Sequence, residues 1–149
     1  MRLLSWNCRG AGRPSTIKAI KALALKEGPD VLFVSETKLK SPKVERLRLS
    51  MGFAKSFFVD SFGKAGGLAL FWKLGVELEV VFSNKNCIVV LVYSDPPDNP
   101  WLMIGVHGPP YLAMRRKFWR LMEEIIDSFS GLWMLIEDIN SIVTSSEKR

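Results

Sequence analysis

The chain has 149 residues, of which 48% are hydrophobic and 24% are charged. This composition excludes a disordered tail and fits one globular domain of ordinary size over residues 1–149. The 21 Lys and Arg residues outnumber the 15 Asp and Glu residues, which gives a net charge of +6. An excess of this size weakly favours a polyanionic partner such as nucleic acid.

The chain holds two cysteines, Cys8 and Cys87, and a single histidine, His107. These residues cannot supply a four-ligand zinc site, and the two thiols do not form a disulfide scaffold, so we expect an intracellular protein. The first apolar stretch is too short for a signal peptide. The longest uncharged run, residues 99–114, contains three prolines and is too short to cross a bilayer. We therefore expect no association with a membrane.

The first predicted elements are a strand, a helix and a second strand. An apolar strand is predicted over residues 2–8, and Ser15 or Thr16 is predicted to cap the helix that follows. Gly28 before a proline ends that helix, and residues 31–35 form the next strand. A βαβ unit of this length predicts parallel strands, whose C-terminal ends meet at one edge of the sheet.

The pattern changes after a second short helix over residues 43–51. Four β-rich runs follow, over residues 53–60, 67–72, 76–83 and 87–94. Because the turns between them are too short for helices, they predict an antiparallel meander. A strand over 101–106, an amphipathic helix over 113–129 and a strand over 132–137 complete an α/β (α+β) chain.

Polar residues follow three of the predicted strands. Asn7 lies at the C-terminal end of the first strand and Glu36 follows the second, so an amide and a carboxylate are predicted to meet where oxygen ligands suit Mg²⁺. Asp138 and Asn140 follow the last strand as Asp-x-Asn, a spacing that suits a base or water ligand and an anion-positioning amide. Taken singly, each pair is explained more simply by ordinary strand-end and turn residues.

Together, these residues belong to four motifs that resemble the endonuclease/exonuclease/phosphatase superfamily, which includes exonuclease III-like nucleases and DNase I. The motifs are LSWNCRG (residues 4–10), VSETK (34–38), GGLAL (66–70) and IEDIN (136–140), the last in place of Gly-Asp-Phe-Asn. With RRKFW at 115–119 and SEKR at 146–149, the chain is similar to the endonuclease encoded by LINE-type retrotransposons, notably those of plants. The resemblance extends from Met1 to Arg149.

The resemblance implies a two-sheet α/β sandwich of the DNase I/exonuclease III type that binds DNA and cleaves a phosphodiester bond with Mg²⁺ or Mn²⁺. It implies that Glu36 ligates the metal and that Asn7 supports it. Asp138 would orient or deprotonate the attacking water, and Asn140 would hold the scissile phosphate. A retroelement origin would also imply a nuclear location. The oligomeric state stays open.

Two loop arginines and one histidine are further candidates. Arg9 and Arg13 are either contacts to the DNA backbone or simply solvated loop charges. His107 stands where the family has a tyrosine whose hydroxyl reaches the phosphate, and an imidazole could also donate there. Glu137 replaces the motif's glycine and places a second carboxylate beside Asp138.

The resemblance also implies that the C-terminal half of the domain is missing. That half would bring the strands of the second sheet and a Ser-Asp-His-like motif, for which no histidine remains. We therefore expect an apolar sheet face with nothing packed on it, and weak or absent cleavage.

Three alternatives to a weakened nuclease stay open at this point. The first is an active nuclease completed by a partner chain, and the second is a non-catalytic nucleic-acid-binding module that uses the net charge. The third is a dinucleotide-binding domain, because Gly10, Gly12 and Ser15 between a strand and a helix partly match that fingerprint, with Glu36 after the next strand. Abasic DNA, target-site duplex and RNA are all possible substrates.

Overall fold

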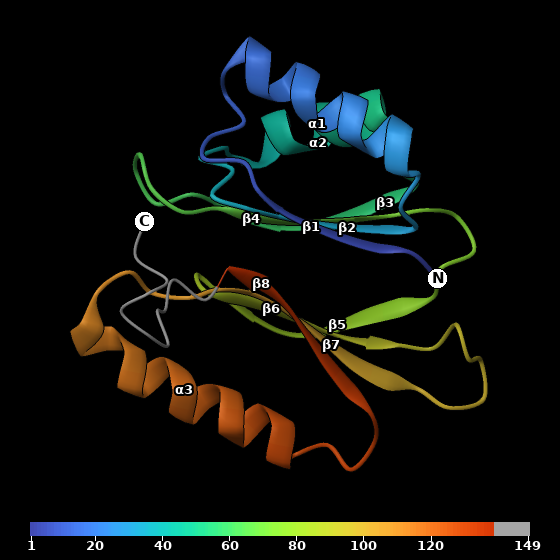
Figure 1. Cartoon of the computed structure of the whole chain (residues 1–149), viewed down its shortest axis with the longest axis vertical. Helices are drawn as coiled ribbons and strands as arrows, with labels where there is room; N and C mark the ends of the chain where they lie inside the picture. Colours follow the sequence, from blue (N-terminus) through green and yellow to red (C-terminus); the bar gives the residue numbers. More distant parts are fainter. Residues whose placement is uncertain (139–149) are drawn as a thin grey trace, which may run out of the picture.

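Two four-stranded β-sheets face each other, with helices on both outer faces (Figure 1). A computed structural model describes residues 1–138 of the chain. Helices α1 and α2 cover the first sheet, and α3 covers the second. The predicted two-sheet α+β architecture is therefore confirmed.

The first sheet begins with the predicted parallel pair. Strand β1 (Leu3–Asn7) runs beside β2 (Val31–Ser35), and Asn7 lies opposite Ser35. Helix α1 (Pro14–Glu27) connects them. It ends at Gly28, which adopts the left-handed conformation and donates its N–H to the Ala24 carbonyl at 3.0 Å.

The start of α1 differs from the prediction. Its N-cap is Arg13, which makes no side-chain capping hydrogen bond, and Pro14 occupies the first helical turn. Ser15 and Thr16 lie inside the helix, so the prediction that one of them caps it is wrong. Proline takes this place because its fixed φ suits the first turn, where its missing N–H needs no intrahelical partner.

The rest of the first sheet is antiparallel. After α2 (Ser41–Met51), strands β3 (Lys55–Val59) and β4 (Leu68–Trp72) complete the strand order β1-β2-β4-β3. Strands β2 and β4 are buried along their whole length because the helices cover one face and the second sheet covers the other. This double burial explains why both are continuous apolar runs.

The second sheet comes from the same chain. Strands β5 (Leu78–Asn84), β6 (Cys87–Val92), β7 (Trp101–His107) and β8 (Trp133–Asp138) lie in that order. The predicted antiparallel pairing holds for β5 to β7. Strand β8 instead runs parallel to β7, because α3 (Leu112–Asp127) carries the chain back across the sheet.

The expectation of an uncovered sheet face is wrong. The strands that were predicted to extend the first sheet after β4 form the second sheet and pack against the first. The buried side chains between the sheets are Val31, Phe33, Leu68, Leu70, Trp72, Ile88, Val90, Val92 and Met103. Strand β1 lies against β8, and β2 lies against β7. Because the pairs β1–β2 and β7–β8 are both parallel and Glu36 contacts His107, the carboxyl ends of all four strands come to one edge.

The two sheets approach closely at Gly105 of β7. A Cβ atom there would lie 2.6 Å from both Cδ2 and Cε2 of Phe33, a fully buried side chain of β2. We expect Gly105→Ala to lower the free energy of unfolding by about 1–3 kcal/mol through overpacking, as measured by urea denaturation. Gly12→Ala, whose Cβ would be 3.8 Å from its nearest neighbour, is the control. Equal stability of the two variants would contradict the close contact.

None of the helices within residues 1–138 is long and apolar enough to cross a membrane.

Candidate active site

Polar residues from both sheets lie at the edge where β1, β2 and β7 end. Asn7 is the last residue of β1, Glu36 follows β2, and His107 is the last residue of β7. His107 Nε2 lies 3.4 Å from Glu36 Oε1. The two sheets thus place a carboxylate and an imidazole in direct contact, beside the end of β1.

Glu36 is held in a strained backbone conformation. Its φ is 52°, in the left-handed region that a glutamate adopts at a cost of about 1–3 kcal/mol. The next two residues fix it, because Thr37 donates its N–H to the Gly67 carbonyl at 3.1 Å and Lys38 donates to Gly66 at 2.9 Å. The start of β4 therefore sets the position of Glu36. The Glu36 side chain remains 26% exposed, so water and solutes can reach it.

The glycine pair of the third motif makes this arrangement possible. Gly67 has a φ of 91°, and a Cβ atom there would lie 2.3 Å from Thr37 Oγ1. Only glycine allows the β4 backbone to come this close to the turn that carries Glu36.

Cys8 connects the ends of β1 and β2. Its N–H donates to the Ser35 carbonyl at 3.1 Å, and its thiol lies 3.4 Å from the carbonyl oxygens of Ser35 and Glu36. Burial raises the pKa of this thiol, so it stays protonated at neutral pH. Cys8 is therefore a structural support of the Glu36 turn rather than a nucleophile.

Asn7 shapes the loop between β1 and α1. Its Oδ1 accepts the backbone N–H of Arg9 at 3.0 Å, which holds Arg9 at a φ of 48°. Arg9 and Arg13 are both exposed on this loop. The structure thus places the two predicted arginines near the edge at which Asn7 ends β1.

His107 is buried and held firmly by its neighbour Asn86. The His107 N–H donates to the Asn86 carbonyl at 2.8 Å, and Asn86 Nδ2 donates to the His107 carbonyl at 2.9 Å. Within the described part of the chain, His107 Nδ1 has no hydrogen-bond partner. Such an unpaired buried nitrogen typically costs about 1–3 kcal/mol, and groups of this kind often mark functional sites.

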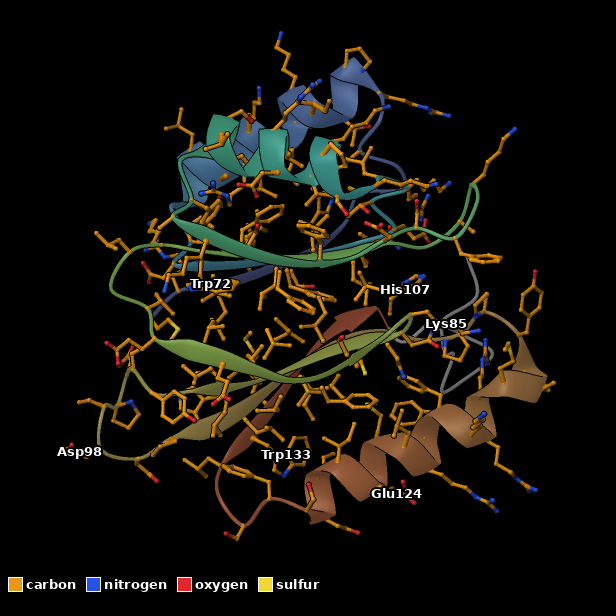
Figure 2. The ribbon with its side chains drawn as sticks, turned by 180° about the vertical axis from the view of Figure 1, so that it is seen from behind. Trp72, Lys85, Asp98, His107, Glu124 and Trp133 are labelled. Atoms are coloured by element: carbon orange, nitrogen blue, oxygen red, sulfur yellow. The ribbon has the colours of Figure 1, made fainter. Side chains whose placement is uncertain are left out.

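A pocket of about 380 Å³ opens beside this pair. Three lysines line it, Lys38, Lys64 and Lys85, none of which was predicted from the sequence to be a site residue. Lys85 and His107 lie at one end of the sandwich, and Trp72 lies at the other (Figure 2). Asp60 also lines the pocket, but its Oδ1 accepts hydrogen bonds from the backbone and hydroxyl of Ser41. The pocket thus has three lysines against the two carboxylates of Glu36 and Asp60, an excess of positive charge that suits an anionic ligand.

The donor set suits a hydrated hard cation. Among the side chains that the structure describes, those of residues 1–136, no three from His, Cys, Asp or Glu form a group that could hold a metal ion. Mg²⁺ does not need such a group, because it retains water and is commonly bound by one or two carboxylates. Glu36, with the Asn7 amide on the neighbouring strand, fits that requirement.

The remaining predicted residues belong to the last motif. The backbone of Asp138 lies opposite His107 in the parallel β7–β8 register, at the same edge as Glu36. The side chain of Asp138, and the whole of Asn140, lie outside the described residues.

The sheet topology does not support a dinucleotide-binding domain. That fold requires successive parallel strands on both sides of the phosphate loop. Here β2 is followed in the sheet by the antiparallel strands β4 and β3.

Residues 4–131 match the sequence profile of the Endonuclease/Exonuclease/phosphatase family. The match covers most of the chain, which therefore belongs to this family. No curated protein sequence matches it significantly.

Solved structures of similar fold include three nucleic-acid enzymes. A 3′ phosphatase from Neisseria bound to a product DNA hairpin has a TM-score of 0.69 at 17% identity, over 98% of this chain and 60% of that one. An AP endonuclease from Archaeoglobus fulgidus has a TM-score of 0.67 at 16% identity, over 97% and 59%. An AP endonuclease from Leishmania major has a TM-score of 0.66 at 15% identity, over 92% and 54%. The chain thus spans little more than half the length of these enzymes.

Proposed function

We propose that the chain is a divalent-metal-dependent phosphodiesterase domain that cleaves DNA, derived from the endonuclease of a LINE-type retrotransposon. The observation that carries the proposal is the contact between Glu36 and His107 at the shared edge of two sheets, beside a lysine-lined pocket. Family membership and the DNA-related activities named for the similar structures support it. The retrotransposon origin rests on the sequence motifs, and it would place the protein in the nucleus.

Each residue at the edge has a role in this proposal. Glu36 and Asn7 would hold Mg²⁺ or Mn²⁺, which when bound stabilises negative charge on the phosphate and on the leaving oxygen. His107, held beside Glu36, would donate a hydrogen bond to the phosphate. Asp138 would orient the attacking water, and Asn140 would contact the scissile phosphate. The exposed Arg9 and Arg13 would bind flanking phosphates.

We further propose that these 149 residues cleave DNA only slowly. His107 is the only histidine in the sequence, so a Ser-Asp-His-like motif would have to come from additional chain. General acid–base catalysis typically contributes about 10²–10⁴-fold to a rate. Without general acid–base catalysis, only phosphate binding and charge stabilisation would accelerate cleavage.

Nicking of supercoiled plasmid tests the proposal directly. The purified chain should convert supercoiled to nicked circles slowly with MgCl₂ or MnCl₂ and should stop when EDTA is added. Nicking that continues in EDTA, or none with either metal at high protein concentration, would refute a metal-dependent nuclease.

The charge distribution favours a second candidate, a nucleic-acid-binding module without catalysis. The net charge is +6, and three lysines line one pocket. Such a module would bind without nicking.

Salt dependence measures the electrostatic part of binding in either case. If Lys38, Lys64 and Lys85 each neutralise one phosphate, these three contacts should contribute about −2 to −3 to the slope of log K against log salt. Lys85→Ala should reduce that slope by about one, whereas the exposed Lys18→Ala on α1 should leave it unchanged. Fluorescence anisotropy at about 50–200 mM salt gives the slope. Equal slopes for wild type and Lys85→Ala would exclude this pocket as the phosphate contact.

A further inference from the structure

Two aromatic rings stand exposed at the pocket that contains Glu36 and His107. The exposed fraction is 93% for Phe62 and 70% for Tyr111. Both residues line this pocket, although one comes from the β3–β4 connection and the other precedes α3. A single exposed apolar residue needs no explanation, but two large rings at one charged pocket do.

Both rings are carried by well-defined backbone. Phe62 and Ala65 exchange two backbone hydrogen bonds, at 3.0 and 3.2 Å, which close a tight turn around Gly63. Tyr111 follows two prolines and forms the N-cap of α3, where its carbonyl accepts the N–H of Met114 at 3.1 Å. Because little backbone freedom remains to be lost, the rings can bind a flat ligand at a small entropic cost.

The chemistry of the pocket favours a nucleobase attached to a phosphate. Flat aromatic faces stack on any base, and the lysines of the pocket suit its phosphates. An acidic peptide fits less well, because its carboxylates could pair with the lysines but would offer no flat face to Phe62 and Tyr111. The pocket volume of about 380 Å³ lies within the range of small-ligand sites.

Phe62 and Tyr111 can stack only on a base that has left the base stack of the duplex. In a continuous duplex the base faces are covered by their neighbours, so an unpaired or extruded nucleotide is required.

We propose that Phe62 and Tyr111 stack on an unpaired nucleobase next to the phosphate at Glu36 and His107. The domain then binds single-stranded or locally unpaired DNA in preference to continuous duplex. The position of the phosphate rests on the proposed function, but the stacking requires no cleavage and is tested without metal.

An oligonucleotide that contains 2-aminopurine provides the test, because stacking on an aromatic ring quenches its fluorescence. In EDTA, the wild-type chain should quench the single strand and bind it about tenfold or more tightly than the matching duplex. Phe62→Leu and Tyr111→Leu each keep apolar volume but remove the ring. Each should weaken single-strand binding by about 5- to 150-fold, the loss expected for one stacked base.

Two control variants separate stacking from other effects. Tyr111→Phe keeps the ring and should retain affinity and quenching. Leu74→Ala removes a side chain that is 88% exposed just after β4, at the opposite edge of the sheet, and should change neither. Three results would overturn the proposal: no quenching of 2-aminopurine, equal affinity for duplex and single strand, or a loss of affinity in Leu74→Ala as large as in the ring variants.

The outcome is separable from that of the nuclease proposal. Metal-dependent nicking with unchanged binding in Phe62→Leu and Tyr111→Leu would reject stacking alone. Ring-dependent quenching without nicking would support stacking and reject only the catalytic role.

Discussion

Glu36→Gln is expected to reduce magnesium-dependent plasmid nicking by about 100-fold or more, comparable with the loss of a preorganised charge-stabilising group. Glutamine keeps the shape of the side chain but removes the negative charge that would hold the cation. The Glu36 side chain is partly exposed and contacts His107. The substitution should therefore change the free energy of unfolding little, as a surface change does. The rate of nicked-circle formation and a thermal melt measure the two effects separately.

A second carboxylate provides the matched control for this variant. Glu77 lies in the β4–β5 connection, at the edge opposite Glu36, and Glu77→Gln removes the same charge. It should nick at the wild-type rate. If Glu36→Gln also retains that rate, the activity does not arise from this edge.

Local patterns were sufficient to predict most of the elements. The apolar runs of β2 and β4 and the amphipathic face of α3 lie close to their predicted positions because each is a direct result of burial. The parallel β1–β2 pair follows from the length of the βαβ unit. Sequence periodicity therefore predicted an element correctly where the burial of its own side chains fixes its pattern of apolar residues.

The apolar runs and turn residues of the sequence did not predict that strands β5 to β8 form a separate sheet. The connection from β4 to β5, residues 73–77, has the polar and glycine content of an ordinary hairpin turn. Nothing in its composition distinguishes a turn within one sheet from a crossing to another. The apolar β6 strand was compatible with either arrangement, and only packing against Phe33 and its neighbours decides between them.

The same reasoning applies to the site. The ends of β1 and β2 bring Asn7 and Glu36 to one edge, and this could be deduced from chain direction alone. The contact between Glu36 and His107 depends on how one sheet lies against the other, so no local pattern encodes it. Phe62 and Tyr111 come from surface turns without periodicity, and their shared pocket exists only in the folded chain.

Gly67→Ala is expected to lower the free energy of unfolding by about 2–4 kcal/mol, more than Gly105→Ala or Gly12→Ala. Two effects combine: a φ of 91° strains any residue with a Cβ atom, and the new methyl group meets Thr37 Oγ1 at 2.3 Å. Thr37 is only 1% exposed and has no room to move away. The clash should therefore displace the Glu36 turn and reduce nicking further than the loss of folded protein explains.

Gly66→Ala separates the two effects, because Gly66 also has a positive φ, 70°, but a Cβ atom there would have no neighbour within 4 Å. It should show the backbone strain alone, about 1–2 kcal/mol, and largely retain activity. The double variant Gly67→Ala/Thr37→Ala removes the clashing oxygen and should recover part of the stability lost in Gly67→Ala. Urea denaturation and nicking rates on the same preparations compare the three variants. Equal losses of stability in Gly66→Ala and Gly67→Ala would mean that the close approach of Gly67 to Thr37 does not position Glu36. The end of β2 and Cys8 would then hold the strained turn at Glu36 instead.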